Sequence, residues 1–394
     1  MTDWFSEANS LFEYTQSLRR DFHMHPELGF QEKRTAGIVA RELSALGLNV
    51  QTGVAETGVV ALLEGGQPGP VVLVRADMDA LPINEETGAP YASQTPGVMH
   101  ACGHDGHTAI LLTVARLLHA HRADLAGTVK LVFQPAEEGL GGAARMVEAG
   151  VLENPRPAVT LALHLWNDQP LGWIGVARGA AMAGAEIFKV KVRGKGGHGA
   201  APHQTHDPVL AASQIVNALQ TIVARNIAPL QSAVVSVCTI HGGEAFNIIP
   251  QQVELSGTIR TFEPEVREKV LERFEIITYG LAETFGCTAE IELTRLTPAV
   301  INDAASAARV EAVARRLFPD ANIDTAHNIT MGSEDMAFMM EKVPGCFFFV
   351  GSANKEKNLD AGHHHPCFDF DEQALPRAAA LMAAVVADLL KKPA

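Results

Sequence analysis

The pattern of apolar residues changes near residue 183, and this change limits the folds that are open to the chain. Before it, strand-sized apolar runs at residues 58–64, 70–77 and 127–134 alternate with helical segments such as residues 35–46. Runs that are apolar throughout indicate strands covered on both faces, so we expect a mixed, mostly parallel central sheet flanked by helices. The same pattern returns late in the chain, with a strand expected over residues 346–351.

Residues 183–295 have a different pattern. Within them, residues 186–193 alternate between polar and apolar, which predicts a strand with one exposed face. The expected order of elements is strand, helix, two strands, helix and strand, which is the ferredoxin-like motif. We therefore expect an α/β protein with two domains: one built from residues 1–182 and 296–394, and an inserted ferredoxin-like α+β domain over residues 183–295.

The composition argues against several classes of protein. The chain has 394 residues, 47% of them hydrophobic, which is too long for one ordinary core. A net charge of −14 without a basic stripe argues against nucleic acid as a partner. The sequence contains no apolar segment of membrane-spanning length, no secretory signal pattern at its start, and five scattered cysteines that do not form a disulfide framework. We expect no membrane partner, and a cytoplasmic protein with free thiols.

Residues 100–107 contain three histidines, a cysteine and an aspartate. Cys102 and His104 stand two apart, just before a helix expected from residue 107. Thiolate and imidazole are ligands for borderline-soft metal ions, so this pair is a candidate metal site. The alternative is a buried cysteine and a capping aspartate beside surface histidines. His100 and His107 are the weaker candidates, as supporting or surface groups.

Further ligand types follow at the ends of later strands. Glu137 and Glu138 come after the strand at 127–134. If that segment is extended, the two side chains point in opposite directions, so one can bind a metal while the other acts as a base. His164 is expected to close a strand over residues 158–165, where a lone histidine is commonly a core residue. The histidines at 363–365 could equally be solvated loop residues, and only the joint occurrence of these groups favours a centre for two metal ions.

Asp77 and Asp79 stand at the end of the strand over residues 70–77. A carboxylate in that place can orient a histidine ligand, although an aspartate in a turn is an equally good interpretation. In the inserted domain, glycine-rich loops present His198 and Asn247, and Arg260 ends a strand. These three could bind a substrate carboxylate and stabilise an oxyanion, or they could be ordinary surface residues.

As a set, these motifs resemble the aminoacylase/carboxypeptidase-type binuclear metallohydrolases. The branch that the chain resembles includes hippurate hydrolases, N-acyl-amino-acid deacetylases and indole-acetyl-amino-acid hydrolases. The resemblance covers nearly the whole chain. It is carried by the segments DMDALP (77–82), CGHDGH (102–107), QPAEEG (134–139), GKGGHG (194–199), NIIP (247–250) and HHP (364–366), together with His164.

The resemblance implies roles for the matching positions. It implies five metal ligands, with Cys102 as the bridge between two divalent ions of zinc, manganese, cobalt or nickel. The implied ligands are Cys102, His104, Glu138, His164 and His364, the last selected by the family's His-x-Pro spacing. Glu137 would be the general base, and Asp79 the orienting aspartate. Asp77 stands where other relatives have a histidine.

In such relatives the inserted domain is a lid that also forms the dimer interface. The resemblance therefore implies a homodimer or homotetramer, with His198, Asn247 and Arg260 as substrate residues and His198 also as a catalytic group. The implied reaction is hydrolysis of the amide bond of an N-acyl amino acid. A dipeptidase or carboxypeptidase with the same centre is the alternative, so the small-molecule partner is an N-acyl amino acid or a short peptide. A non-catalytic metal-dependent binding protein and a redox role for Cys102 are rival hypotheses of other classes.

Overall fold

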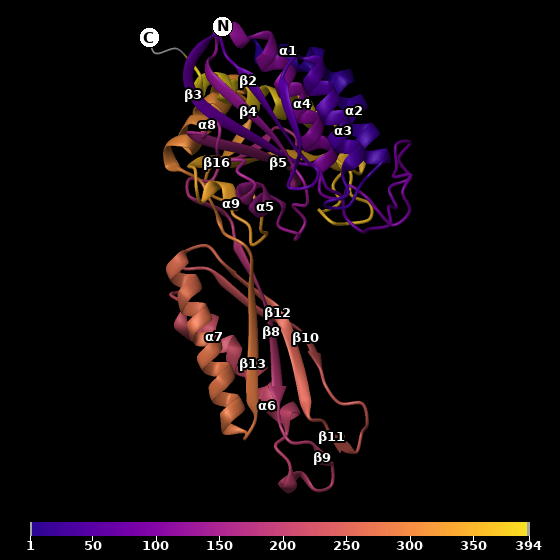
Figure 1. Ribbon diagram of the computed structural model, residues 1–394, viewed down its shortest axis with the longest axis vertical. Coiled ribbons are helices and arrows are strands. Elements are labelled where there is room, and N and C mark those ends of the chain that lie inside the picture. The colour runs from indigo at the N-terminus through magenta and orange to yellow at the C-terminus, as the bar shows by residue number, and fades with distance from the viewer. Residues whose placement is uncertain (1, 392–394) are drawn as a thin grey trace. The chain divides into compact units, whose positions relative to one another are not determined.

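An eight-stranded mixed sheet forms the centre of the larger of two units (Figure 1). The computed structural model describes residues 2–391. The order of the strands in this sheet is β1-β2-β4-β3-β5-β16-β6-β15. Their bounds are β1 Asn49–Val54, β2 Gly58–Glu64, β3 Gln67–Asp77, β4 Ala126–Gln134, β5 Val159–Pro170, β6 Trp173–Gly175, β15 Asn322–Asp324 and β16 Gly345–Ala353.

Four neighbouring strands of this sheet, β4, β3, β5 and β16, run parallel to one another. Asp77 at the end of β3 pairs with Gln134 at the end of β4, and Val350 of β16 pairs with Leu165 of β5. The segments that follow these strands therefore leave the sheet at one edge. In sheets of this kind, ligands bind at the carboxyl ends of the strands.

Helices α2, α4 and α10 pack against one another, and α4 and α10 also contact β5. Helix α4 is buried along nearly its whole length, as expected for a helix between the sheet and a second helical layer. The mixed α/β class with helices flanking a central sheet is thus confirmed. The helices of the larger unit are α1 Trp4–Ser10, α2 Phe12–Met24, α3 Lys33–Ala45, α4 His104–Ala120, α5 Gly142–Glu148, α8 Ala304–Leu317, α9 Ala337–Met340 and α10 Ala374–Leu389.

The apolar spacing of Trp4, Ala8, Leu11 and Leu18 predicts one helix over residues 4–21, and here the structure differs. The segment forms two helices, α1 and α2, which meet at Leu11. The Ser10 hydroxyl donates to the carbonyl of Glu7 and the Leu11 amide donates to the carbonyl of Ala8. A serine hydroxyl that bonds back to the preceding turn competes with the helix ladder, which explains the break.

Two further boundaries differ where they affect the candidate site. Helix α4 begins at His104 rather than at residue 107, directly after Gly103, whose φ of 91° is easily reached only by glycine. Strand β5 continues to Pro170, so His164 lies inside the strand and does not close it. Hydrophobic periodicity does not report either boundary, because a left-handed turn and a strand pairing are set by partners elsewhere in the chain.

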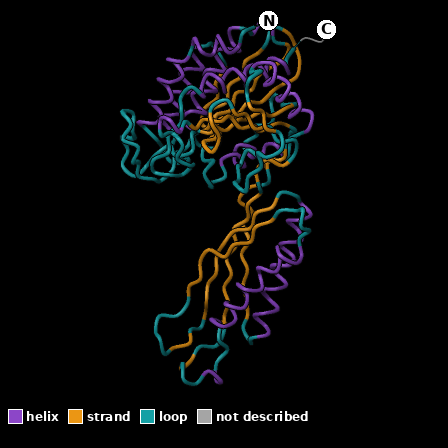
Figure 2. The backbone as a smooth tube through the Cα atoms, turned by 180° about the vertical axis from the view of Figure 1, so that it is seen from behind, coloured by secondary structure: helices purple, strands orange, loops and turns teal. Residues whose placement is uncertain are grey.

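The smaller unit consists of Met182–Val300 and Thr330–Glu334. Its four-stranded sheet has the order β10-β12-β8-β13, with every neighbouring pair antiparallel. Both long helices lie on one face of this sheet (Figure 2). The expected ferredoxin-like βαββαβ arrangement is confirmed. Its elements are β8 Gly184–Arg193, α6 Pro208–Thr221, β10 Ala233–His241, β12 Gln252–Thr261, α7 Pro264–Thr284 and β13 Thr288–Thr297, with the short strands β9 Gly197–His198 and β11 Ile248–Ile249.

The segment Thr330–Glu334 was expected in the first domain but lies with the smaller unit. The amide of Ala183 donates to the carbonyls of Thr330 and Gly332, at 3.2 and 2.9 Å. This contact joins residues far apart in the sequence, so a pattern search could not find it. The chain passes between the units at β7 (Ala180–Met182) and β14 (Val300–Ile301) as well. Among residues 2–391, no helix is both long enough and apolar enough to cross a bilayer.

A pair of phenylalanine substitutions tests the core of the smaller unit. Phe274 on α7 is fully buried, with its ring centroid 4.7 Å from that of Phe188. Phe274→Ala should lower the free energy of unfolding of this unit by about 3–5 kcal/mol, because it leaves a cavity. The matched control is Phe246→Ala in the same unit, where the side chain is fully exposed. Urea unfolding checks both, and equal effects of the two substitutions would contradict the described core.

Candidate metal centre

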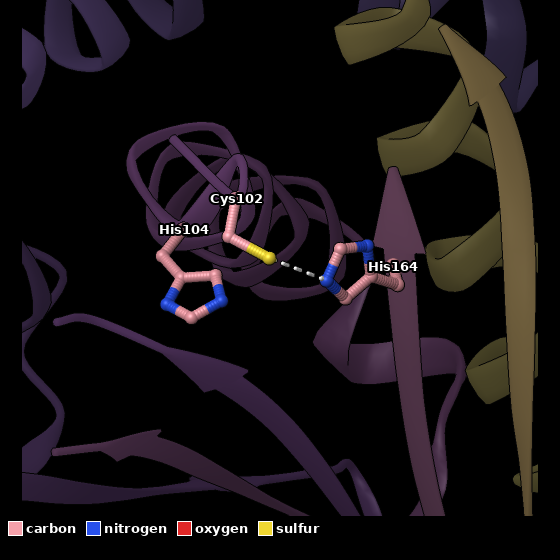
Figure 3. A group of neighbouring side chains, drawn as sticks. All are labelled: Cys102, His104 and His164. Carbon is pink, nitrogen blue, oxygen red and sulfur yellow. Dashed lines mark hydrogen bonds between the residues drawn. The ribbon is translucent and has the colours of Figure 1, made fainter. Parts of the chain in front are cut away.

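A cluster of ligand-type side chains lies at the carboxyl edge of the parallel strands. Cys102, His104 and His164 each place one ligand atom within 4.8 Å of the others. The thiol of Cys102 lies 3.5 Å from Nε2 of His164, and His104 projects beside it from the start of α4 (Figure 3). The left-handed turn at Gly103 separates the two ligand candidates of this loop and lets the helix start directly after it.

A second group of three shares the same thiol. Cys102, Glu138 and His364 also lie within 4.8 Å of one another, and Oε1 of Glu138 is 3.3 Å from Nε2 of His364. The His364 amide donates to the carbonyl of Ala101 at 2.8 Å, which holds this loop beside Cys102. Because one sulfur belongs to both groups, Cys102 would be common to both sets of ligands if the site held two ions. The structure therefore brings together all five residues that the resemblance implies as ligands.

Two buried atoms of this cluster make no hydrogen bond within the described part of the chain. Nε2 of His104 and Oε1 of Glu138 are buried, and neither has a hydrogen-bond partner among residues 2–391. Buried polar atoms are nearly always hydrogen-bonded, so unpartnered atoms that face a common space need an explanation. A divalent cation provides one, and a set of thiolate, imidazole and carboxylate suits zinc and the neighbouring first-row metals. The residues present thus fit the implied metal centre.

The electrostatics of the cluster argue against a redox role for the Cys102 thiol. Burial raises the pKa of the Cys102 thiol well above its ordinary value, whereas a reactive cysteine needs a lowered pKa. Burial also lowers the pKa of His164, which keeps its imidazole neutral, as a metal ligand must be. A thiolate at this position needs a nearby positive charge, which a bound cation supplies.

Asp79 connects two of the candidate ligands. Nδ1 of His104 lies 2.9 Å from the carbonyl oxygen of Asp79 and 3.3 Å from its Oδ1. The other carboxylate oxygen accepts the Glu138 amide at 3.0 Å. A proton on Nδ1 leaves Nε2 of His104 free for a metal, which is how neighbouring carbonyl and carboxylate groups fix the orientation of metal-binding histidines. This geometry supports the orienting role expected for Asp79.

The weaker histidine candidates have other positions. His107 has both ring nitrogens engaged, Nδ1 with Oδ1 of Asp77 at 2.7 Å and Nε2 with the Leu165 amide at 2.9 Å. Asp77 is in turn paired with Arg75 at 2.7 Å. These hydrogen bonds fit a supporting role for Asp77 and His107, although their ligand atoms also lie within 4.8 Å of one of His104. His100 is buried near the site, and neither of its nitrogens has a hydrogen-bond partner among the described residues.

The turn after β4 differs from the extended segment that we expected. Ala136 has a left-handed backbone with φ of 55°, and the Gly139 amide donates to the carbonyl of Glu137 at 2.6 Å. Glu137 and Glu138 therefore do not point in opposite directions. Their carboxylates and His104 place ligand atoms within 4.8 Å of one another, so both approach the same space. The separation of base and ligand that we inferred from an extended backbone is wrong, because the chain turns here.

The turn also depends on contacts that the sequence did not reveal. The Asp335 amide donates to Oε1 of Glu137 at 3.3 Å. Glu32, which is fully buried, accepts the Ala136 amide at 2.9 Å through Oε1 and the Thr57 hydroxyl at 2.6 Å through Oε2. Nothing in the local pattern around Glu32 identifies it as part of this region. Only its apolar surroundings in the fold distinguish it from a surface glutamate.

The three candidate substrate residues of the smaller unit are not gathered in one place. His198 and Asn247 lie on one hairpin, where His198 pairs with Ile248 and the Gly199 amide donates to the Asn247 carbonyl. Both side chains are exposed. Arg260 lies near the far end of β12, where its guanidinium donates to hydroxyls of Thr258 and Ser333 at 3.1 and 2.8 Å. Burial lowers the pKa of Arg260.

Comparison with known proteins agrees with this geometry. Residues 73–388 match the model of peptidase family M20/M25/M40. The chain belongs to this family. The N-acetylcysteine deacetylase of Bacillus subtilis is 41% identical over 95% of this chain and 97% of the relative. The IAA-amino acid hydrolase ILR1-like 4 of Arabidopsis thaliana is 41% identical over 96% of this chain and 86% of the relative.

A solved structure of the same family has a similar fold. The Bacillus subtilis YXEP protein, described as a dinuclear metal binding peptidase from the M20 family, has a TM-score of 0.85 and 37% sequence identity to this chain. The similarity covers 97% of this chain and 99% of that structure. The resemblance to binuclear metallohydrolases is confirmed, and as a member of this family the chain is a metal-dependent hydrolase.

The shared position of Cys102 gives a test by metal content. Cys102→Ala should release both ions, because the thiol belongs to both ligand groups, whereas His364→Ala should release only one. Elemental analysis after dialysis measures the metal-to-protein ratio. His365→Ala, in the exposed neighbour of His364, is the matched control and should keep the wild-type ratio. A Cys102→Ala protein that retains both ions would exclude the bridge.

Glu32 gives a test by pH. Burial raises the pKa of Glu32 from 4.5 to about 7. The folded protein therefore keeps this proton between pH 4.5 and 7, where the unfolded chain releases it. The stability that this difference contributes is present below pH 4.5 and is lost as the pH rises through 7. Glu32→Gln has no such loss, so its free energy of unfolding relative to wild type should increase from pH 5 to pH 8, by about 2 kcal/mol.

Urea unfolding at the two pH values measures this change. The control is Glu148→Gln, in an exposed glutamate at the end of α5, which should differ from wild type by the same amount at both pH values. A Glu32→Gln protein that follows the control would show that Glu32 is not titrating in the folded state near neutral pH.

Proposed function

We propose that this hydrolase cleaves the amide bond of N-acyl amino acids, such as N-acetyl or benzoyl derivatives, and releases a carboxylic acid and a free amino acid. The observation that carries the proposal is the convergence of Glu137, Glu138 and His104 within 4.8 Å. Such a cluster places a carboxylate that can move a proton next to one that can bind a metal. The identity of 41% to N-acetylcysteine deacetylase, over nearly the full length of both chains, supports the substrate class.

We assign the metal centre to the five residues whose ligand atoms cluster at the sheet edge. They are Cys102, His104, Glu138, His164 and His364, which would hold two divalent ions of zinc, manganese, cobalt or nickel, with Cys102 common to both groups of ligands. When bound, such ions acidify a water molecule and polarise the amide carbonyl. Asp79 orients His104 and holds the backbone of Glu138.

Glu137 is the general base and the general acid in this proposal. It accepts a proton from the attacking water as the oxygen bonds to the carbonyl carbon. It then donates that proton to the amide nitrogen as the carbon–nitrogen bond breaks, which releases the amine. The Asp335 amide donates to Oε1 of Glu137 at 3.3 Å, which orients this carboxylate.

We assign Arg260 and Asn247 to the carboxylate of the substrate, and His198 to the oxyanion that develops in the reaction, where it also counts as a catalytic group. Strand β12, which separates Arg260 from the hairpin of His198 and Asn247, is ten residues long. Eight residues of extended chain span about 26 Å, too far for one small substrate to contact both ends. This separation supports a homodimer or homotetramer in which His198 and Asn247 serve the neighbouring subunit.

The alternative is a dipeptidase or carboxypeptidase that uses the same centre. It is favoured by the peptidase family match and by the description of the YXEP protein as a peptidase. A panel of N-acetyl amino acids, hippurate and dipeptides separates the two, through the kcat/KM of each substrate. We also propose a cytoplasmic location, supported by the five cysteines, all of which are free thiols in the described part of the chain.

The proposal is tested by removing the proton-transfer group. Glu137→Gln keeps the shape of the side chain but cannot accept a proton, so kcat should fall by about a hundredfold to ten-thousandfold. Elemental analysis should show unchanged metal content, because the five proposed ligands remain. Glu148→Gln, in the exposed glutamate of α5, is the control and should keep full activity. Wild-type turnover by the Glu137→Gln protein would refute the assignment.

A further inference from the structure

Glu32 is a buried carboxylate that the proposed chemistry does not use. It directly precedes α3 and none of its surface is exposed. Its two oxygens accept from neutral donors, the Ala136 amide at 2.9 Å and the Thr57 hydroxyl at 2.6 Å. Burying an ionisable group without a cationic partner is costly, so a carboxyl group in this place needs a reason beyond packing.

The backbone of Ala136, which Glu32 contacts, has an unfavourable conformation, and holding it there is a reason for the buried carboxyl group. Its φ of 55° lies in the left-handed region, which residues other than glycine rarely adopt. Both polar groups of its backbone are engaged: the amide donates to Glu32, and the carbonyl accepts the Gly142 amide at 3.0 Å. Such conformations persist only when the surroundings impose them. The next residue is Glu137, so the orientation of the proposed base depends on this turn.

The segment that leads to Glu32 contacts both loops of the site. The Ala80 amide, one residue after Asp79, donates to the Glu27 carbonyl at 2.9 Å, and Leu28 forms a bridge with Ala80. Gly29 packs so closely on the turn that a Cβ there would lie 3.0 Å from the Cβ of Ala136. Residues 27–32 therefore link the loop that orients His104 to the turn that carries Glu137.

The backbone of Glu138, in the same turn, is held by a different hydrogen bond. Its amide donates to Asp79 at 3.0 Å, independently of Glu32. Loss of the Glu32 contact would therefore disturb the base more than the metal ligand next to it. The two effects can be separated by experiment, because metal content reports Glu138 and turnover reports Glu137.

We propose that Glu32 is a positioning residue that acts through the Ala136 amide to hold Glu137 in its working orientation. This inference rests on the proposed role of Glu137 as the base. Glu32 does not touch the reacting atoms, and its contribution is the hydrogen bond to the backbone. A glutamine at this position can still accept that bond through its amide oxygen, and it can donate to the Thr57 hydroxyl.

The test compares Glu32→Ala with Glu32→Gln. Glu32→Ala should lower kcat by about 10- to 100-fold, because small displacements of a catalytic group have effects of that size. Its KM and metal content should stay near the wild-type values. Glu32→Gln should restore most of the turnover. Val39→Ala, in a fully buried residue of the adjacent helix α3, is the control for lost stability and should leave kcat unchanged.

Hydrogen–deuterium exchange gives a readout that does not depend on activity. The peptide containing Ala136 should exchange faster in Glu32→Ala than in wild type, and at the wild-type rate in Glu32→Gln. Unchanged exchange or unchanged kcat in Glu32→Ala would overturn the inference, as would an equal loss of kcat in Glu32→Ala and Val39→Ala. If Glu137→Gln keeps full activity instead, the proposed function fails, while the exchange data still report whether Glu32 holds the turn.

Discussion

The hydrogen bonds of Asp79 connect two parts of the candidate metal centre. Its carbonyl oxygen lies 2.9 Å from Nδ1 of His104, and its carboxylate accepts the Glu138 amide at 3.0 Å. One buried residue after β3 thereby connects the start of α4 with the turn after β4. It also determines which nitrogen of His104 stays free.

The charges around the site fall into two groups with opposite roles. Asp77 forms an ion pair with Arg75 and a hydrogen bond with His107, so its carboxylate is satisfied and adds rigidity to the site. Nε2 of His104 and Oε1 of Glu138 are buried atoms that make no hydrogen bond among residues 2–391. A site of this kind is costly for the protein alone and becomes favourable when a cation is bound, which couples metal binding to the stability of the fold. The hydrogen-bonded residues Asp77 and His107 thus form rigid surroundings for the atoms of His104 and Glu138 that could bind a cation.

The order of elements and most ligand types could be predicted from the sequence, because both have local signals. Apolar runs marked β2, β3 and β4, and the alternating pattern marked β8, so the two sheets could be assigned to different classes. The turn after β4 could not be predicted, since its left-handed Ala136 is imposed by Glu32 from another part of the chain. For the same reason, the extended backbone expected at Glu137 and Glu138 was wrong.

The sequence by itself determined the fold class, the presence of two domains and a candidate set of metal-binding residues. These properties follow from periodicity and from residue types at strand ends, which the local chain carries. Only the tertiary structure decided which histidines keep a free nitrogen. Both ring nitrogens of His107 are engaged, by Asp77 and by the Leu165 amide, whereas Nε2 of His104 makes no hydrogen bond among the described residues. The physical reason is that a hydrogen bond between residues distant in the chain leaves no trace in the spacing of either residue.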